Sequence, residues 1–291
     1  MLRLVIPKGS LEPMTLSLLS DADLPLRRSS DRDYHGTIAD PRIERVSILR
    51  PQEIPTYVAE GRFDVGITGL DWVHETGAKV EIISGLSLSG RAGGTARIVL
   101  AVPNDSKISS AKDVPDGFRI STEYPETTRK AFTELGTDVN IFLSYGATEA
   151  KVPEIVDGVV EVTESGSTLR RAGLKIVETF LESETVLIAS PQAAADEEKM
   201  RAIGDIRLLL EGVIQARGRV LVKLNVPASA LESVLEVLPS MKAPTISQLA
   251  HSEDYAIETV VERSQINTLI PSLKERGATD IVELPISKIV P

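Results

Sequence analysis

Residues 45–69 read RVSILRPQEIPTYVAEGRFDVGITG, and this stretch decides the fold class of the first part of the chain. The apolar run 45–50 is typical of a buried strand, and residues 63–69 form a second such run with a glycine-rich exit. Pro51 is expected to open a helix between them, because proline suits a first helical turn, and Gly61 is expected to end it. A strand, a helix and a strand in this order predict two parallel strands joined by a crossover helix.

The same alternation extends to both sides of this stretch. A strand at 2–6 and a helix near 12–20 precede it, which predicts a βαβαβ unit with a parallel sheet. A second group of strands is expected further along the chain, and the strand at 184–190 is expected to return to the first group. This second group and its helices are predicted at 96–103, 118–124, 126–136 (helix), 148–157 (helix) and 159–163.

We therefore expect an α/β protein with two lobes around a central cleft, similar to periplasmic binding proteins. Lobe I is expected at 1–95 plus 190–215 and lobe II at 96–189. Residues 216–291 change to the order βαββαβ, which predicts a ferredoxin-like, ACT-like domain. Pro271 lies inside its second predicted helix, so a kink or a shifted helix start is expected there.

Composition excludes several classes of function. The chain has 291 residues, a formal net charge of −10 and no cysteine, which argues against an extended nucleic-acid surface, disulfides and thiolate catalysis. The three histidines, His35, His74 and His251, lack the spacing of a zinc site. No apolar run approaches the length of a membrane span or of a signal-peptide core, so we expect a cytoplasmic protein that binds neither nucleic acid nor membrane.

The segment DGVVEVTESGSTLR at 157–170 carries the most chemistry. A strand that enters a glycine-containing turn before a helix leaves backbone N–H groups free for an anion, and Ser165, Ser167 and Thr168 can add hydroxyl donors. Asp157 and Glu161 are four residues apart, so on a strand they would share a face and could hold ribose hydroxyls and Mg²⁺. By the residues alone, a capped helix start is the more ordinary explanation of the turn.

The same segment resembles the phosphoribosyl-pyrophosphate loop of the ATP phosphoribosyltransferases, which catalyse the first step of histidine biosynthesis. The family pattern is roughly D-x-I-V-D-x-V-x-x-G-x-T-L-R; Glu161 stands where Asp is common, and Ser167 and Ser10 stand where Arg is common. The resemblance covers nearly the whole chain, in the segments IPKGSLEP (6–13), 49–75, 121–132, 144–158, 224–249 and 273–289.

This resemblance implies that the protein joins ATP to 5-phosphoribosyl 1-pyrophosphate (PRPP), releasing pyrophosphate, with Mg²⁺ held through substrate phosphates and not by a dedicated protein cage. Asp157 and Glu161 are the expected catalytic residues, and their carboxylates could help to hold Mg²⁺. The expected PRPP-binding residues are Ser165, Gly166, Ser167, Thr168 and Leu169. The expected ATP-binding residues are Lys8, Gly9, Arg50, Thr68 and Gly69. Asp71 is interpreted first as a helix N-cap.

The C-terminal domain resembles the regulatory domain of the long form of the family, which implies feedback inhibition by histidine and a homo-oligomer between dimer and hexamer. The implied histidine-binding residues are Asn225, Met241, Thr245, Val260 and Asp280. Two other readings stay open: a two-lobed small-molecule binding protein, and an amino-acid sensor without catalysis. A binding protein would leave the sugar-phosphate loop unexplained and is expected to carry a signal peptide, and a sensor has no need of the acidic pair before the turn.

Overall fold

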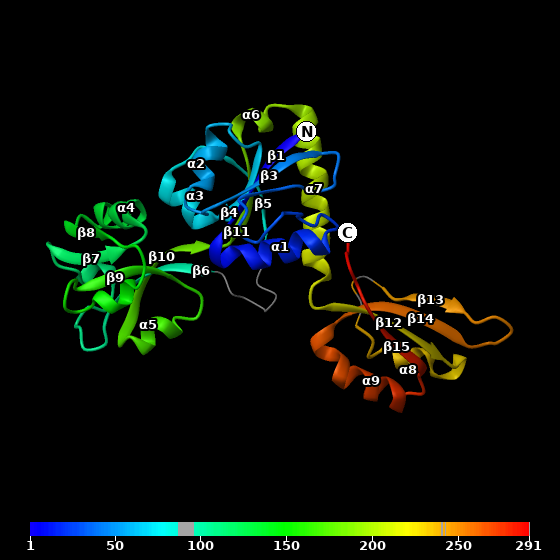
Figure 1. Ribbon diagram of the computed structural model, residues 1–291. Coiled ribbons are helices and arrows are strands. Elements are labelled where there is room, and N and C mark those ends of the chain that lie inside the picture. Colours follow the sequence, from blue (N-terminus) through cyan, green and yellow to red (C-terminus); the bar gives the residue numbers. More distant parts are fainter. Residues whose placement is uncertain (87–95, 240, 242, 291) are drawn as a thin grey trace. The chain divides into compact units, whose positions relative to one another are not determined.

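The computed structural model describes residues 1–86, 96–239, 241 and 243–290 (Figure 1). The chain divides into two compact units, one formed by Met1–Ser20 and Leu24–Arg207 and the other by Asp21–Asp23 and Leu208–Pro291. Helix α7 (Glu197–Ala216) begins in the first unit and ends in the second. Among the described residues, no helix combines the length and the apolar character needed to cross a membrane.

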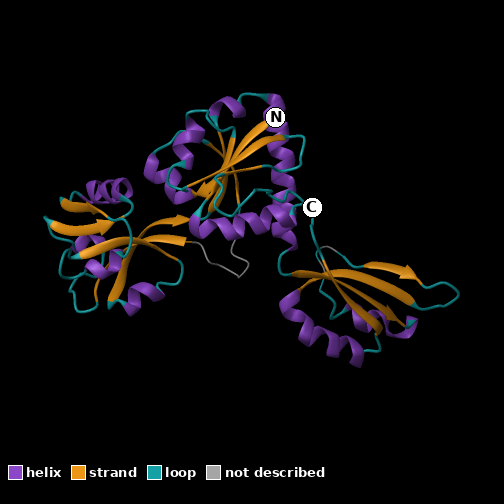
Figure 2. Ribbon diagram, viewed as in Figure 1, coloured by secondary structure: helices purple, strands orange, loops and turns teal. Residues whose placement is uncertain are grey.

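The first sheet of unit 1 has the strand order β2-β3-β1-β4-β11-β5. Strands are drawn in orange in Figure 2. Strand β1 pairs in parallel with both β3 and β4, which confirms the predicted βαβαβ unit. Strand β11 pairs antiparallel with β4 and β5, so the predicted return of the chain to this sheet is also confirmed. The elements of this lobe are β1 (Leu2–Pro7), α1 (Glu12–Asp21), β2 (His35–Gly36), β3 (Ile43–Leu49), α2 (Ile54–Ala59), β4 (Val65–Gly69), α3 (Leu70–Thr76), β5 (Glu81–Gly85), β11 (Thr185–Ala189) and α6 (Pro191–Ala194).

Helix α2 begins three residues later than predicted. Pro51 lies in a turn whose carbonyl accepts a hydrogen bond from the buried Thr68 hydroxyl at 2.9 Å, and Pro55 occupies the first helical turn instead. The helix packs tightly on the sheet at Gly66, where a Cβ atom would come within 2.9 Å of Val58 and 3.0 Å of Ile54. Gly66 therefore serves close packing between α2 and β4.

The second sheet of unit 1 has the order β10-β6-β9-β7-β8, with β7 parallel to both β8 and β9. The predicted helix at 148–157 is wrong, because only a 3-10 turn forms at Thr148–Lys151 and Val152 is already extended. Pro153 explains this end, since it has no N–H to donate and disfavours a helical residue before it. The elements of this lobe are β6 (Ala96–Pro103), β7 (Phe118–Thr122), α4 (Pro125–Leu135), β8 (Val139–Leu143), β9 (Gly158–Thr163), α5 (Ser167–Arg171) and β10 (Leu174–Ser183).

Unit 2 contains a four-stranded antiparallel sheet of order β13-β14-β12-β15, which is the predicted ferredoxin-like arrangement. Helix α9 continues through Pro271 and is followed by Gly277 at φ +94°. Apolar side chains from one face of the sheet and from both helices form a single core. The elements are β12 (Arg219–Val226), α8 (Leu231–Leu235), β13 (Thr245–Gln248), β14 (Tyr255–Glu262), α9 (Ile266–Glu275) and β15 (Thr279–Pro285).

A buried carboxylate ties three segments of unit 1 together. Asp64, 1% exposed, accepts hydrogen bonds from the backbone N–H of Arg3 at 2.8 Å, from its guanidinium at 3.0 Å and from Lys199 Nζ at 2.9 Å. These contacts hold the pKa of Asp64 well below its usual range despite burial.

We expect Asp64→Asn to lower the free energy of unfolding at neutral pH by about 2 kcal/mol, because it removes the charge of a buried carboxylate that accepts hydrogen bonds from two partly exposed cations, Arg3 and Lys199. The pKa of Asp64 is depressed in the folded state, so its contribution is present at neutral pH and is lost as the pH falls through that depressed pKa. Urea unfolding at several pH values measures this. A difference between wild type and variant that stays constant down to acid pH would contradict the assignment.

Candidate active site

The predicted nucleotide-binding residues of the first lobe lie at one edge of its sheet. Lys8 and Gly9 follow β1, and Arg50 follows β3, so they lie at the carboxyl ends of parallel strands, where ligands of open α/β sheets bind. The Lys8 N–H donates to the Leu49 carbonyl at 2.7 Å. A Cβ atom on Gly9, which has φ +88°, would lie 3.8 Å from the Arg50 guanidinium. The structure therefore brings Lys8, Gly9 and Arg50 together.

Thr68 and Gly69 end the neighbouring strand β4, but both are buried. The hydroxyl of Thr68 donates to the Pro51 carbonyl, which fixes the turn that follows Arg50. A Cβ atom on Gly69 would come within 2.1 Å of an Asp71 carboxylate oxygen, so only glycine fits there. Thr68 and Gly69 therefore support the neighbouring turns from the buried side of this edge, and neither presents a side chain to a ligand there.

The predicted PRPP loop lies at the carboxyl edge of the second sheet, directly after β9. Gly166 is buried, has φ +69° and donates its N–H to Thr163 Oγ1 at 2.8 Å. The side chains of Ser165, Ser167 and Thr168 are exposed, whereas Leu169 is 2% exposed and can offer only its backbone. The first N–H groups of α5 have no partner within the helix. The loop thus offers hydroxyl and amide donors to solvent.

The two acids expected to act together lie at opposite ends of β9. Asp157 precedes the strand and accepts bonds from the Arg119 N–H at 2.9 Å and from its guanidinium at 2.6 and 3.0 Å, which lower the pKa of Asp157. Glu161 lies four residues on, roughly 13 Å along an extended strand. Glu161 therefore lies beside the predicted PRPP loop, whereas Asp157 lies at the other end of β9 and is paired with Arg119.

Glu161 lies in an acidic surrounding. It is half-buried, and this burial raises the pKa of its carboxyl, with Glu123 and Glu149 adding to the rise and the Thr148 hydroxyl opposing it. Glu123 directly follows β7, so it shares the carboxyl edge of the sheet with Glu161. Sequence reasoning did not pick out Glu123, because its closeness to Glu161 depends on the pairing of β7 with β9.

The carboxyl edges of the two sheets meet through the helices that follow β4 and β7. The Tyr124 hydroxyl donates to Asp71 at 2.7 Å, and the Ser183 hydroxyl donates to the other Asp71 oxygen at 2.7 Å. Trp72 stacks on Tyr124 with ring centroids 4.5 Å apart. Burial raises the pKa of Tyr124, which keeps its hydroxyl protonated as a donor. The interpretation of Asp71 as an N-cap is wrong, since Gly69 holds that position.

A basic hollow beside β2 and β3 was not predicted. It has a volume of about 540 Å³, and three arginines, Arg27, Arg28 and Arg45, contribute to its lining. Arg28 is already paired with Glu12 at 2.8 Å. Lys8 Nζ lies 4.5 Å from the ring centroid of Tyr34. Because Tyr34 directly precedes β2, this cation lies in the same region of lobe I as the hollow. The hollow depends on β2, a strand too short to be seen in the sequence.

The described residues contain no group of three or more His, Cys, Asp or Glu side chains placed to hold a metal ion. The carboxylates near the loop, Glu161 and Glu123, are hard oxygen donors of the kind that Mg²⁺ prefers.

In unit 2, three of the predicted effector residues share one face of the sheet. Alternate residues of β12 enter the core under α8 and α9, which leaves Asn225 on the opposite face. Val260 pairs with Leu221 and Thr245 pairs with Glu258, so the register places both on that same face. The structure thus brings Asn225, Thr245 and Val260 onto the face that the helices leave open.

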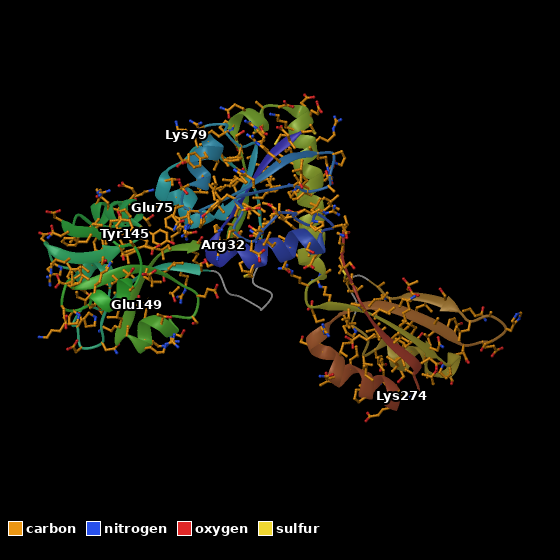
Figure 3. The ribbon with its side chains drawn as sticks, in the orientation of Figure 1. Arg32, Glu75, Lys79, Tyr145, Glu149 and Lys274 are labelled. Carbon is orange, nitrogen blue, oxygen red and sulfur yellow. The ribbon has the colours of Figure 1, made fainter. Side chains whose placement is uncertain are left out.

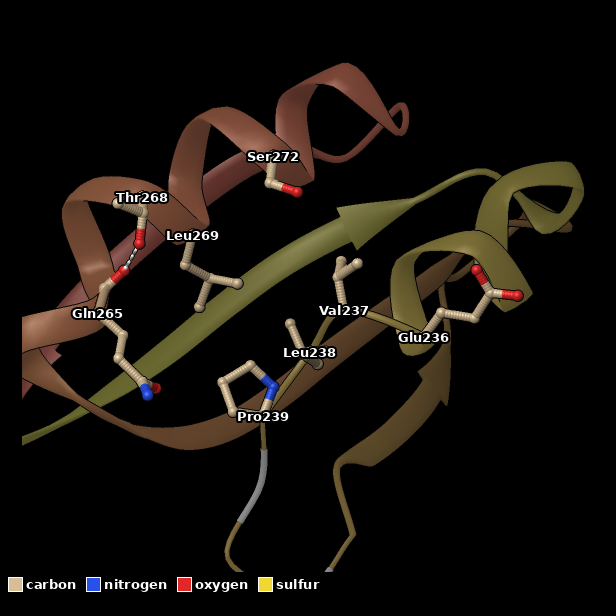
Figure 4. Close-up of a pocket in the computed structure, with 8 residues that line it drawn as sticks. All are labelled: Glu236, Val237, Leu238, Pro239, Gln265, Thr268, Leu269 and Ser272. Carbon is tan, nitrogen blue, oxygen red and sulfur yellow. Dashed lines mark hydrogen bonds between the residues drawn. The ribbon is translucent and has the colours of Figure 1, made fainter.

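The other two predicted effector residues, Asp280 and Met241, lie outside β12, β13 and β14, and Asp280 lies at the start of β15 with a positive φ of 49°. Asn225 Nδ2 donates to an Asp280 carboxylate oxygen at 3.0 Å, and Met241, before β13, is 50% exposed. A hollow of about 470 Å³ lies elsewhere in the unit, between α9 and the end of α8 (Figure 4). None of the five predicted residues lines it; its lining consists of Glu236, Val237, Leu238, Pro239, Gln265, Thr268, Leu269 and Ser272.

Comparison with known proteins places this two-lobed α/β chain with its ferredoxin-like domain among the pentosyltransferases. The family described as ATP phosphoribosyltransferase matches residues 50–211, and the one described as HisG, C-terminal domain, matches residues 216–288. The chain belongs to the ATP phosphoribosyltransferase family.

Relatives of full length agree with this assignment. The chain is 43% identical over 290 residues to the ATP phosphoribosyltransferase of Pelotomaculum thermopropionicum, which covers 100% of this chain and 99% of the relative. It is 44% identical over 289 residues to that of Koribacter versatilis, with 99% of both chains covered. A solved ATP phosphoribosyl transferase (HisG:HisZ) complex from Thermotoga maritima matches with a TM-score of 0.62 and 24% identity, over 72% of this chain and 99% of that one, and supports the fold.

Proposed function

We propose that this protein condenses ATP with PRPP to give N1-(5-phosphoribosyl)-ATP and pyrophosphate, and that histidine inhibits it. The observation that carries the proposal is the contact of Asp71 with Tyr124, because it joins the carboxyl edge of the Lys8 and Arg50 lobe to that of the Ser165–Leu169 lobe. Two substrates held at these edges would face each other. A transfer between them then depends chiefly on orientation.

Each group would have a defined task. The Thr168 hydroxyl and the amides at the start of α5 would donate to the 5-phosphate of PRPP, and Gly166 would let it approach the backbone. The Glu161 carboxylate would face the sugar and stabilise positive charge that develops as pyrophosphate leaves. Lys8 and Arg50, with the arginines of the basic hollow nearby, would neutralise the ATP phosphates.

Magnesium is part of this proposal. Mg²⁺ would neutralise the pyrophosphate leaving group, with most of its ligands from substrate oxygens and water and the remainder from Glu161 and Glu123. Asp157 takes no part in this reaction scheme, because Arg119 already occupies its carboxylate.

The direct test mixes the purified protein with ATP, PRPP and Mg²⁺ and follows both pyrophosphate release and the new nucleotide by chromatography. Formation of both in equal amounts supports the proposal. Binding of ATP and PRPP without release of pyrophosphate would instead identify a two-lobed binding protein, and binding of histidine alone would identify a sensor.

We further propose that histidine binds at the open face of the unit 2 sheet and that the protein acts as a homo-oligomer between dimer and hexamer. Val260→Arg is expected to abolish histidine inhibition while leaving uninhibited turnover within about twofold, because surface substitutions away from the reaction site cost little. Turnover measured against histidine concentration checks this.

Ser272→Ala, in the hollow beside α9, is the matched control and should keep the wild-type response to histidine. If Ser272→Ala lost the inhibition and Val260→Arg kept it, the effector site would have to be moved to the hollow. Light scattering with and without histidine measures the oligomer.

A further inference from the structure

One carboxylate of lobe I caps a helix of lobe II. Glu75, which is labelled in Figure 3, lies on α3. Its carboxylate accepts hydrogen bonds from the Glu126 N–H at 2.8 Å, the Thr127 N–H at 2.9 Å and the Thr127 hydroxyl at 2.7 Å. Both residues lie in the first turn of α4, where backbone N–H groups have no partner within the helix. A side chain more than 50 residues away therefore completes this helix start.

Such a contact is stronger than an ordinary surface hydrogen bond. The acceptor is charged, its two oxygens are both used, and the helix N-terminus favours negative charge. Tyr124, the residue just before α4, directs its hydroxyl to Asp71 and leaves the helix start to Glu75. The helix start in lobe II is therefore capped by a side chain of lobe I.

Helix α3 presents two carboxylates to the second lobe. Asp71 and Glu75 are four residues apart, which places them on one side of the helix. Asp71 is 7% exposed and holds Tyr124, while Glu75 is half-buried and holds Thr127. Trp72, between them in sequence, stacks on Tyr124. We call this set of contacts, Asp71–Tyr124, Trp72–Tyr124 and Glu75–Thr127, the interlobe clasp.

We propose that Glu75 is a positioning residue that sets the lobes in register for the reaction through the interlobe clasp. The proposal rests on the proposed function, in which each lobe holds one substrate. Helix α4 directly follows Glu123 and Tyr124 at the carboxyl edge of β7, so its first turn is fixed relative to the PRPP side. Holding that turn from lobe I fixes the distance between the two substrates.

The expected signature is a fall in kcat without a matching change in substrate affinity. Glu75→Gln keeps the size of the side chain but leaves only one oxygen to accept hydrogen bonds. Each substrate is held by one lobe, so the KM values for ATP and PRPP should stay within about threefold. The kcat should fall roughly 10- to 100-fold, since small misplacement of reacting groups is costly.

The single tryptophan of the chain offers a readout that does not require turnover. Trp72 is 8% exposed, so loosening the interlobe clasp should admit water and shift its emission to longer wavelength. Thr127→Val, which removes the hydroxyl donor, should change kcat and emission in the same direction as Glu75→Gln. Thr127→Ser keeps the hydroxyl and should restore both.

Glu126→Gln is the matched control, because its side chain points to Arg129 while its backbone N–H still reaches Glu75. It should behave as the wild type. Glu75→Gln with wild-type kcat, or with a rise in both KM values and an unchanged kcat, would overturn the proposal. A wild-type protein that released no pyrophosphate would refute the proposed function instead, while unchanged Trp72 emission in Glu75→Gln would refute the interlobe clasp itself.

Discussion

Replacing Thr168 with phenylalanine is expected to reduce turnover roughly 10³-fold, the scale of loss when a group that stabilises reacting charge is removed. Thr168 is exposed in the first turn of α5, so the fold can accept a larger side chain there. The aromatic ring would occupy the space above the amides where the 5-phosphate is proposed to bind. Pyrophosphate release measures the loss, and circular dichroism and urea unfolding should remain those of the wild type.

Two variants isolate the cause of this loss. Thr168→Ser keeps the hydroxyl and should retain most of the turnover. Thr133→Phe makes the same chemical change at an exposed position of α4, far along the chain from the loop, and should leave activity unchanged. Wild-type activity in Thr168→Phe would show that the phosphate is anchored elsewhere, and loss of activity in both phenylalanine variants would point to a general effect of bulk.

The strands that the sequence predicted in unit 1 are those at the centre of each sheet. The four strands that it missed, β2, β5, β8 and β10, are the four edges of the two sheets. An edge strand pairs on one side only and is covered less, and β5 and β8 have no fully buried residue. Apolar content alone did not separate the two kinds of strand, because the missed β8 reads VNIFL whereas the predicted central strand β7 reads FRIST. The order of the elements in unit 2 was predicted, because its β12 and β14 alternate in burial. The first helix is shorter than its sequence suggested, since α8 covers only Leu231–Leu235 after a 3-10 turn at Ala228–Ala230.

In the candidate site, too, the features that depend on neighbouring residues could be predicted, and those that depend on residues distant in the sequence could not. The loop at 165–169 could be predicted because its donors are contiguous in sequence. The contact of Glu75 with Thr127 joins residues 52 positions apart, and that of Asp71 with Ser183 joins residues 112 apart, so neither leaves a local pattern. Asp157 and Glu161 were grouped by an even spacing, but this spacing could not show that Arg119 pairs with the first of them.

Glu161→Gln should lower turnover roughly 10²-fold and at the same time raise the stability of the protein at neutral pH. Burial and the neighbouring acids raise the pKa of the Glu161 carboxyl in the folded state. Its favourable contribution to stability is therefore present at low pH and is lost as the pH rises through the raised pKa. Above that pH the charged form is held at a cost, which glutamine removes. Urea unfolding at several pH values should show a gain that grows with pH.

The same property predicts how activity depends on pH. If the ionised carboxylate of Glu161 stabilises the sugar, wild-type kcat should fall on the acid side at a higher pH than an ordinary glutamate would give. Glu161→Gln should lose this acid limb together with most of its activity.

Asp157→Asn separates the two acids that the sequence grouped together. Because Arg119 lowers the pKa of Asp157, this variant should be less stable at neutral pH and should regain equality with the wild type as the pH falls. Below its unfolding temperature it should keep most of its turnover, in contrast to Glu161→Gln. If Asp157→Asn stayed fully folded but lost turnover as severely as Glu161→Gln, both acids would take part in the reaction. Arg119 would then have to release the Asp157 carboxylate when substrate binds.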